Sequence, residues 1–326
     1  MNPIRKAIVF GGAGFIGSHL IRQLHEGGEY DEIFCVDIAT PRFKTDGASY
    51  VNFNVLEPIP ADLCGTGPAD IFNLAAVHTT PGHEDWEYYW TNIHGASHVC
   101  RFASAVGCQS LVFTSSISVY GPSEEQKDET SKLEPTSAYG RSKLLAEGVH
   151  KLWQSEQPTT RRVTIVRPAV IYGHTERGNF TRLAGLLSRG RFVYPGRKDT
   201  IKSCGYVKDL IRSMLFMRSH NDGVATYNFC RPERYTSEQI CAAFGKVAGY
   251  AAPRIVAPMW LIELAALPFE IVSALGFKND INRERVRKLF NSTNIYPKRL
   301  LDEGFDFRYD IVGSLADWKT TSADFN

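Results

Sequence analysis

The stretch AIVFGGAGFIGSHL, residues 7–20, decides how the rest of the sequence is interpreted. Ala7 to Phe10 form a short apolar run that predicts a strand, and Phe15 to Glu26 have the periodicity of a helix. Between them, glycines allow a tight turn, a close approach of the backbone to a pyrophosphate, and close packing of helix on strand. The N-terminus of the helix offers unpaired N–H groups to phosphate charge. The stretch therefore predicts a dinucleotide-binding turn.

An acidic residue follows at the distance that such a turn requires. Asp37 ends the next predicted strand, 20 residues after Gly17, and is placed to accept hydrogen bonds from the adenosine ribose hydroxyls. Its carboxylate would repel a 2′-phosphate, so we expect NAD and not NADP. Arg42 weakens this preference without reversing it. The alternative is a glycine-rich turn followed by an unrelated aspartate. It is disfavoured because strand, turn, helix and acid would then have the spacing of a dinucleotide site only by coincidence.

Strand-like and helix-like segments alternate through the first half of the chain. The predicted strands are Ala7 to Phe10, Ile33 to Val36, Tyr50 to Phe53, Ile71 to Leu74, Leu111 to Thr114 and Val163 to Val166. The predicted helices between them are Phe15 to Glu26, Trp90 to Val106 and Ala138 to Gln154. This alternation implies βαβ units with right-handed crossovers, and therefore an α/β fold with a doubly wound parallel sheet of the Rossmann type.

The pattern changes after Gly173 and becomes mostly helical. We predict an NAD-binding Rossmann domain over residues 1–173, with 203–230 returning to it. Residues 174–202 and 231–326 are expected to form a smaller, mostly helical substrate-binding domain. Within it, the apolar stretch from Pro258 to Phe277 contains Glu263, Pro268 and Glu270, which favours a buried or lid helix over a membrane span.

Composition excludes several classes of function. The 326 residues carry a net charge of only +2 with no long basic run, so we expect no nucleic-acid partner, and we expect no membrane partner. The seven cysteines include no CxxC pair, and the short apolar run near the N-terminus does not fit a signal peptide. These features favour a cytoplasmic protein with reduced thiols.

A polar loop after the fourth predicted strand contains potential metal ligands. It includes His78, His83, Glu84 and Asp85. A solvated loop explains this composition without a metal, and no metal is expected. His78 is the member that we expect to contact substrate. The basic cluster Arg283, Arg285 and Arg287 is compatible both with phosphate binding and with a solvated helix face.

A tyrosine and a lysine stand four residues apart in the helix predicted from Ala138. Tyr139 and Lys143 therefore project from one face of that helix. A neighbouring cation stabilises a phenolate and brings tyrosine toward useful acid/base strength. Ser116 follows a predicted strand at its C-terminal end and is our choice for the hydroxyl that shares a proton with Tyr139. Ser118 is kept among the candidates that face the substrate, although we favour a turn-forming role for it.

Several stretches together resemble the extended short-chain dehydrogenases/reductases, specifically the NAD-dependent epimerase/dehydratase family. They are GGAGFIGSHL (11–20), Asp37, NLAA (73–76), Asn92 to Gly95, TSSISVYG (114–121), YGRSK (139–143), RPAVIYG (167–173) and YVKDL (206–210). The resemblance implies catalysis by Ser116, Tyr139 and Lys143, with Lys143 also holding the nicotinamide ribose. It implies that the two helices Trp90 to Val106 and Ala138 to Gln154 form a homodimer interface.

The resemblance also implies which residues bind the cofactor and the substrate. The expected NAD-binding residues are Gly11, Gly14, Phe15, Ile16, Gly17, Asp37, Asn54, Val55, Leu74, Ala75, Ala76, Asn92, Tyr139, Lys143, Arg167 and Val170. The expected substrate-binding residues are His78, Ser116, Ser118, Asn179 and Lys202, with Lys202 near a diphosphate.

Departures from the family pattern narrow the reaction. Dehydratases carry an Asp-Glu pair after the catalytic hydroxyl residue, because elimination of water needs a further acid and base. Ile117 and Ser118 occupy those positions. We therefore expect a nucleotide-sugar epimerase acting at C4 through a 4-keto intermediate. Lys202 replaces a common Arg, which weakens bidentate recognition of a diphosphate. Val170 replaces a common Asn, and with the apolar stretch Pro258 to Phe277 and the basic segment after it this keeps open an NAD(P)-dependent oxidoreductase of a nucleotide-sugar or of a hydroxysteroid-like alcohol. A non-catalytic NAD(P) sensor is a third alternative, disfavoured by the presence of both Tyr139 and Lys143.

Overall fold

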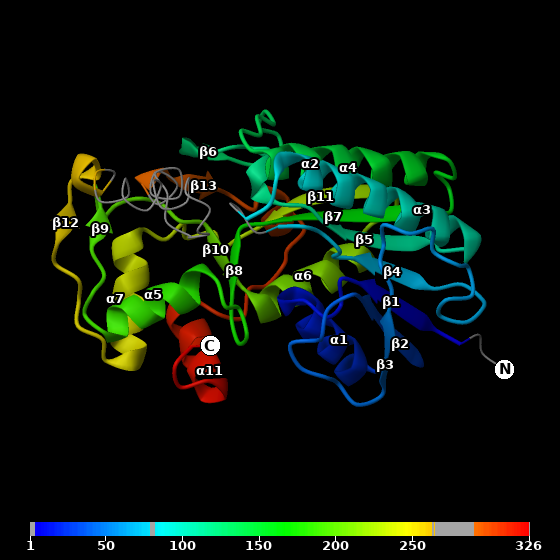
Figure 1. The fold of residues 1–326 in the computed structure, drawn as a ribbon, viewed down its shortest axis with the longest axis horizontal. Helices are drawn as coiled ribbons and strands as arrows, with labels where there is room; N and C mark the ends of the chain where they lie inside the picture. Colours follow the sequence, from blue (N-terminus) through cyan, green and yellow to red (C-terminus); the bar gives the residue numbers. More distant parts are fainter. Residues whose placement is uncertain (1–3, 79–81, 263, 265–289, 326) are drawn as a thin grey trace.

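The fold is built on one parallel sheet whose strand order is β11-β7-β5-β4-β1-β2-β3 (Figure 1). This computed structural model describes residues 4–78, 82–262, 264 and 290–325. The seven strands are β1 (Lys6–Phe10), β2 (Glu32–Asp37), β3 (Ala48–Asn52), β4 (Asp70–Asn73), β5 (Ser110–Thr114), β7 (Arg162–Pro168) and β11 (Val224–Phe229). Every neighbouring pair is parallel. The chain order reverses between β1 and β4, and ligands of such sheets bind at that point beyond the carboxyl ends of the strands.

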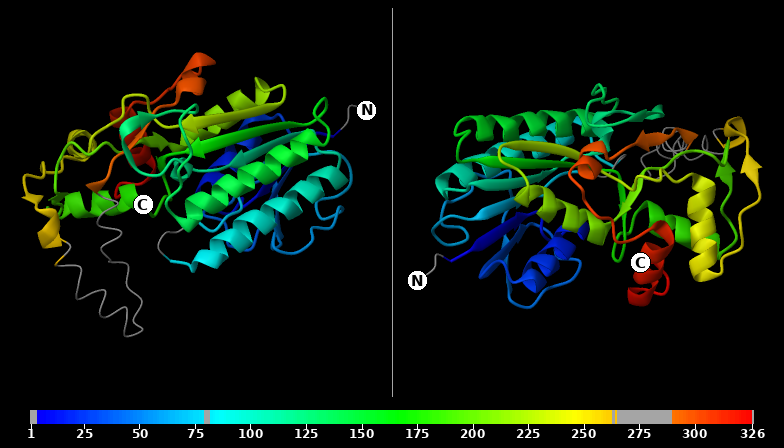
Figure 2. Two further views of the ribbon diagram at one scale, coloured as in Figure 1. Left: turned by 90° about the horizontal axis from the view of Figure 1, so that it is seen from above. Right: turned by 180° about the vertical axis from the view of Figure 1, so that it is seen from behind.

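Helices cover both faces of the sheet, as the alternation in the sequence predicted (Figures 1 and 2). α1 (Phe15–Gly27) and α6 (Val207–Ser219) pack on one face, and α3 (Gly95–Ala105) and α4 (Ala138–Ser155) pack on the other. Successive residues of β1 alternate between the two cores: Ala7 and Val9 join the α1/α6 side, whereas Ile8 and Phe10 join the α3/α4 side. The prediction of a doubly wound Rossmann sheet is confirmed.

One predicted helix begins earlier than expected and is irregular. The sequence indicated a polar loop that includes Glu84 and Asp85, and a helix from Trp90. In the structure α2 (Asp85–Tyr89) already precedes a π-helix over Trp90–His94, which leads into α3. The capping box of Glu84 and Glu87 explains the early start, since the Glu84 N–H donates to Glu87 Oε2 at 2.7 Å. The wider π-turn changes which side chains face the sheet.

Shorter elements extend the fold beyond the main sheet. They are β6 (Ser123–Lys127), η2 (Ile117–Val119), β8 (Val170–Tyr172), α5 (Asn179–Ser188), β9 (Tyr194–Pro195), β10 (Cys204–Tyr206), α7 (Ser237–Ala248), β12 (Val256–Ala257), β13 (Thr293–Ile295), α10 (Lys298–Asp302) and α11 (Ile311–Thr321). α5 and α7 coincide with the helical patterns that the sequence shows over Asn179 to Ser188 and Ser237 to Ala248. Three two-stranded parallel pairs, β10-β8, β12-β9 and β13-β6, connect distant segments.

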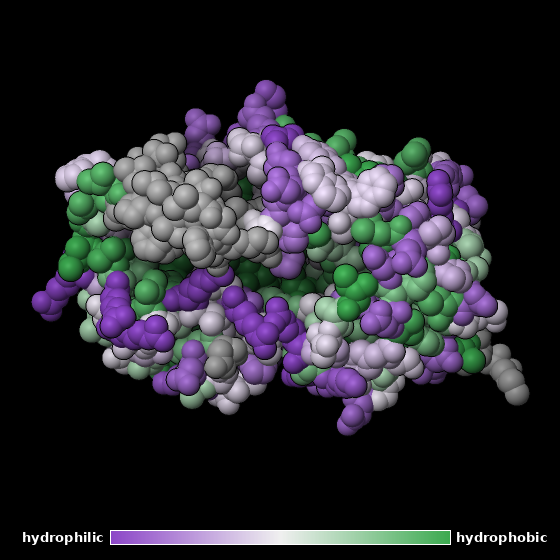
Figure 3. Space-filling view, viewed as in Figure 1, coloured by the Kyte–Doolittle hydropathy of each residue, from purple (hydrophilic) through white to green (hydrophobic). Residues whose placement is uncertain are grey.

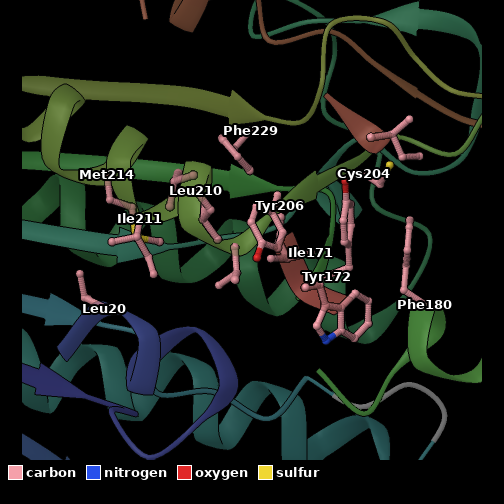
Figure 4. Close-up of a cluster of buried hydrophobic side chains, with 14 of the residues drawn as sticks. Leu20, Ile171, Tyr172, Phe180, Cys204, Tyr206, Leu210, Ile211, Met214 and Phe229 are labelled. Atoms are coloured by element: carbon pink, nitrogen blue, oxygen red, sulfur yellow. The ribbon is translucent and has the colours of Figure 1, made fainter. Parts of the chain in front are cut away.

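The core of the α1/α6 side continues from the sheet into these later elements (Figure 4). It runs from Leu20 and Leu210 to Tyr172 and Phe180, whose rings stack with centroids 4.1 Å apart. This continuous packing fixes the segment after β8 against the end of the sheet.

The C-terminal apolar and basic segments are only partly described. Most of Pro258 to Phe277, and all of the Arg283, Arg285 and Arg287 cluster, lie outside the described residues. Within the described ranges, no helix has both the length and the apolar character that crossing a bilayer requires.

Candidate active site

The glycine turn after β1 has the geometry that a pyrophosphate requires. Gly11 has a φ of +75°, and a Cβ at this position would lie 2.6 Å from the backbone nitrogen of Ala75. A Cβ on Gly17 would lie 2.5 Å from the carbonyl oxygen of Gly11. α1 begins at Phe15 with the exposed Gly14 as N-cap and no side-chain cap on its first turn. The N–H groups at this end of α1, from Phe15 and Ile16 onward, are therefore available to an anion.

Asp37 lies beside this turn at the end of β2. Its Oδ2 accepts a hydrogen bond from the Ala13 N–H at 3.0 Å, and its Oδ1 accepts one from the Ala39 N–H at 3.0 Å. Each carboxylate oxygen keeps lone-pair capacity for a ribose hydroxyl, and the side chain is half-exposed. Two backbone donors thus orient the carboxylate that the sequence placed at the adenosine ribose.

The candidate adenine residues follow β3. The Asn54 Oδ1 accepts from the Leu56 N–H at 3.0 Å, which forms a local turn. Val55 is buried, and its carbonyl is hydrogen-bonded to a ring nitrogen of His98 at 2.9 Å. The Asn54 Oδ1 can accept a second hydrogen bond, such as one from an adenine amine. The assignment of Asn54 to the cofactor stays a prediction.

Asn92 holds the loop after β4 against α4. Its Oδ1 accepts from the Val77 N–H at 2.9 Å, and its Nδ2 donates to the Ser142 Oγ at 2.9 Å. Leu74, Ala75 and Ala76 lie in the same loop, and the Leu74 N–H donates to the Phe10 carbonyl at 2.8 Å. The π-helix that contains Asn92 therefore fixes the loop that follows β4 at the carboxyl end of the sheet.

Tyr139 and Ser116 are brought together from two different elements. The Tyr139 side chain hydrogen-bonds that of Ser116, while burial raises the pKa of Tyr139 to about 12 against the effect of this hydrogen bond. Gly140 makes the approach possible, because a Cβ there would lie 2.4 Å from the Ser118 carbonyl oxygen. The Ser118 N–H donates to the Ser116 Oγ at 3.1 Å, as a turn-forming pair does.

Lys143 lies one helical turn after Tyr139 and is buried. Its Nζ donates to the Thr114 carbonyl at 2.8 Å and lies 4.9 Å from the centre of the Phe113 ring. Burial lowers the pKa of Lys143 to about 7, and the nearby charge of Glu147 acts in the opposite direction. The ammonium group is thereby held at the end of β5.

A buried ionic network joins α4 to β7, one helical turn after Lys143. Arg167 donates from Nε and Nη2 to the two carboxylate oxygens of Glu147 at 2.8 and 2.7 Å, and from Nη1 to the Tyr120 hydroxyl at 2.7 Å. Ser115 Oγ donates to Glu147 Oε1 at 2.6 Å. Burial favours a raised pKa for Glu147, but the hydrogen bonds and charge of Arg167 outweigh it and hold that pKa below its usual value. The Arg167 guanidinium is thus oriented by Glu147 and Tyr120. The cofactor role of Arg167 stays a prediction.

Sequence reasoning missed Glu147. A signal was present, because Tyr139, Lys143 and Glu147 recur at intervals of four residues and so share a face of α4. The pairing with Arg167, 20 residues away on β7, had no such signal.

The remaining predicted residues lie around this cluster. His78 is exposed and hydrogen-bonds the backbone of Ala76. Val170 is half-buried in β8, and Asn179 is exposed at the start of α5. Lys202 is half-buried, and its Nζ donates to the Asn291 carbonyl at 2.6 Å. Their substrate and cofactor roles stay predictions.

The histidines and acids around the start of α2 carry atoms that can ligate a metal ion. Among the described residues, no group of three or more His, Cys, Asp or Glu side chains is arranged to hold a metal ion. Residues 79–81 of that loop lie outside the described part.

The fold and this site define a dinucleotide-binding α/β protein of the Rossmann class. The model of the NAD dependent epimerase/dehydratase family matches residues 7–230, which is more than half of the chain, so the chain belongs to this family and NAD is its cofactor. The uncapped start of α1, the close backbone approach at Gly11 and the oriented Asp37 carboxylate fit this cofactor.

Relatives agree with this membership. The chain is 29% identical over 244 residues to the N-acetyl-alpha-D-glucosaminyl-diphospho-ditrans,octacis-undecaprenol 4-epimerase of Escherichia coli O157:H7, covering 74% of each chain. A UDP-glucose 4-epimerase from Thermotoga maritima, solved with UDP-glucose, superposes with a TM-score of 0.75 at 19% identity over 98% of this chain and 99% of that one. MoeE5 in complex with UDP-glucose and NAD gives 0.74 at 21% identity over 98% and 99%. The two solved structures show that the fold is shared.

Proposed function

We propose that the protein is an NAD-dependent 4-epimerase of a sugar carried on a diphosphate, with a nucleotide-sugar as the first candidate substrate. One observation supports this most strongly: Tyr139, its hydrogen-bond partner Ser116, and the buried Lys143 meet at the carboxyl ends of the strands, at the edge where the glycine turn lies. The relatives named above include two 4-epimerases. Ile117 and Ser118, where dehydratases have an acid pair, argue against elimination of water.

Each side chain has a role in this proposal. Tyr139 accepts the proton of the C4 hydroxyl and returns it, and Ser116 donates a hydrogen bond to the same substrate oxygen. Lys143, when protonated, stabilises the phenolate of Tyr139. Bound NAD supplies the acceptor and donor of hydride, and Asp37 and the start of α1 hold it in place. Asn92 keeps the loop after β4 in position through Val77.

The test uses purified protein with its bound NAD and a panel of UDP-, GDP-, dTDP- and CDP-sugars. The expected result is formation of the C4 epimer, followed by NMR, without added cofactor and without net NADH. Stoichiometric NADH production would instead support the oxidoreductase alternative. Absence of both reactions over the full panel would contradict the proposal for nucleotide-sugars.

A lipid-linked sugar diphosphate is the second candidate substrate. The relative from Escherichia coli is named for an undecaprenol-linked substrate. In this protein the segment around Trp260 exposes large apolar side chains. The same assay with a polyprenyl diphosphate sugar tests this candidate.

We further propose a cytoplasmic homodimer with the domain division expected from the sequence, 1–173 and 203–230 against 174–202 and 231–326. The seven cysteines are all buried free thiols, as suits a reducing compartment. Leu145 and Leu152 lie two turns apart on α4 and are 53% and 65% exposed, which suits an isologous helix interface. Light scattering should report a dimer for the native protein and a monomer for Leu145→Asp/Leu152→Asp.

A further inference from the structure

A large apolar surface is exposed at one end of the molecule, in a part of the chain that contains none of the proposed catalytic residues. We call it the tip surface, and it consists of Val193, Ile255, Val256, Trp260, Leu261 and Leu264. Trp260, Ile255 and Leu264 are 66%, 64% and 55% exposed. Figure 3 shows hydrophobic residues gathered at the left edge, over the end of the molecule that carries β9 and β12 in Figure 1. Exposed contiguous apolar surface of this kind marks an interaction site.

The local backbone is ordered so that these side chains face outward together. β9 and β12 pair in parallel, and the Tyr194 N–H donates to the Ile255 carbonyl at 2.9 Å. A helical turn follows, in which the Leu261 N–H donates to the Pro258 carbonyl at 3.0 Å. Met259 faces inward, since its Cγ lies 3.0 Å from the position of a Cβ on Gly196. Trp260 and Leu261 therefore project away from the body of the protein.

The described residues around the tip surface carry charge of one sign. In the stretches that form it, 186–196 and 250–264, the charged residues that the structure describes are Arg189, Arg191 and Arg254, while Glu263 lies outside the described residues. All three arginines are exposed, and none forms an ion pair with any residue in the ranges that the structure describes. The neighbouring Arg197 and Lys198, by contrast, are paired with Glu124 and Glu238. A basic rim around an apolar centre is complementary to anionic lipid headgroups above an acyl layer.

We infer that the tip surface docks onto the surface of an anionic lipid bilayer. Trp260 is amphipathic and suits the depth of the headgroups, Leu261, Leu264 and Ile255 enter the apolar boundary below them, and the arginines contact lipid phosphates. This attachment lies in the plane of the membrane and needs no spanning helix. It modifies the expectation of no membrane partner, which rested on the absence of a span in the sequence.

The position of the tip surface is compatible with catalysis at a membrane. It lies at the opposite end of the molecule from α3 in the views of Figures 1 and 2, so docking leaves the proposed dimer helices free. Docking follows from exposure and charge alone and does not depend on the proposed reaction.

Flotation of the full-length protein with vesicles tests the inference. Vesicles of phosphatidylglycerol and phosphatidylcholine should carry the native protein, and vesicles of phosphatidylcholine alone should carry much less. Trp260→Ser/Leu261→Ser should weaken binding to the anionic vesicles about tenfold or more, and Arg191→Glu/Arg254→Glu should reduce it to the level of the neutral vesicles. A matched control is Trp86→Ser, since Trp86 is 64% exposed on α2, and it should float like the native protein.

The outcomes separate cleanly. Equal flotation of the native protein and Trp260→Ser/Leu261→Ser, failure of the native protein to bind anionic vesicles, or an equal loss in Trp86→Ser would each overturn the inference. An unchanged thermal midpoint of the variants confirms that they are folded. Flotation requires neither cofactor nor turnover, so a negative result in the epimerase assay leaves this test unaffected.

Discussion

Replacing Glu147 by glutamine tests whether the buried network supports the catalytic residues. The Glu147 and Arg167 side chains are only 1% and 4% exposed, and their closest N–O distance is 2.7 Å. Glutamine keeps the shape but removes the charge, so the Arg167 guanidinium is left buried without a counter-ion. Breaking a buried pair in this way costs about 3–5 kcal/mol, and the retained amide oxygen places the expected loss at the lower end, ~3 kcal/mol.

Urea denaturation measures this loss in free energy of unfolding. The midpoint should fall with an unchanged slope, because the surface exposed on unfolding does not change. The matched control is Glu156→Gln. Glu156 is 58% exposed, and its buried partner Arg161 keeps hydrogen bonds to the Trp153 carbonyl and the Ser104 Oγ, so the expected loss is only ~1 kcal/mol. Equal losses in the two variants would refute the reasoning that burial gives the Glu147 pair its importance.

The same variant has a second readout that a purely structural role would not change. The charge of Glu147 raises the pKa of Lys143, against the burial that lowers it to about 7. Without that charge the pKa of Lys143 falls further, so the decline in turnover with rising pH should begin at a lower pH in Glu147→Gln. A pH profile with an unmoved limb would show that Glu147 does not act on the reaction through Lys143.

Three further perturbations follow from the site. Tyr139→Phe should lower kcat by a factor on the order of 10²–10⁴ while NAD stays bound, and near-native turnover would remove Tyr139 from the mechanism. Gly11→Ala should abolish NAD retention, because its Cβ would lie 2.6 Å from the Ala75 nitrogen. The control is Gly148→Ala, which should stabilise α4 by ~0.5–1 kcal/mol, because a Cβ at Gly148 would have no atom within 4 Å. Similar effects at both positions would contradict the close approach at Gly11. Burial lowers the pKa of His150 from 6.5 to about 4, so the unfolded state binds more protons in this interval and stability should fall by ~3 kcal/mol as the pH drops through it. His150→Gln should flatten that dependence and the exposed His220→Gln should not, as judged by urea titrations at several pH values.

The parts of the site that the sequence determined are those built within one element or across one turn. Gly11, Gly14 and Gly17 lie in the predicted turn and Asp37 ends the predicted next strand, because strand, turn and helix are contiguous and the local backbone imposes their spacing. Their roles toward NAD stay predictions. Tyr139 and Lys143 were found for the same reason, since helical periodicity puts residues four apart on one face. The bounds of α5 and α7 also rest on local periodicity, and the start of α7 is fixed by the capping box of Thr236 and Gln239.

The tertiary structure decided which of these elements meet. The pairing of Glu147 with Arg167, the bond from Asn92 to Ser142 across 50 residues, and the return of β13 beside β6 depend on contacts between segments far apart in the chain. No residue pattern encodes such partners, because a buried glutamate or arginine needs only some counter-charge, and the packed sheet determines which one is within reach. The tip surface also depends on tertiary packing. The sequence predicted a buried or lid helix from Pro258. In the structure Met259 packs inward at Gly196, and Trp260 and Leu261 are left uncovered.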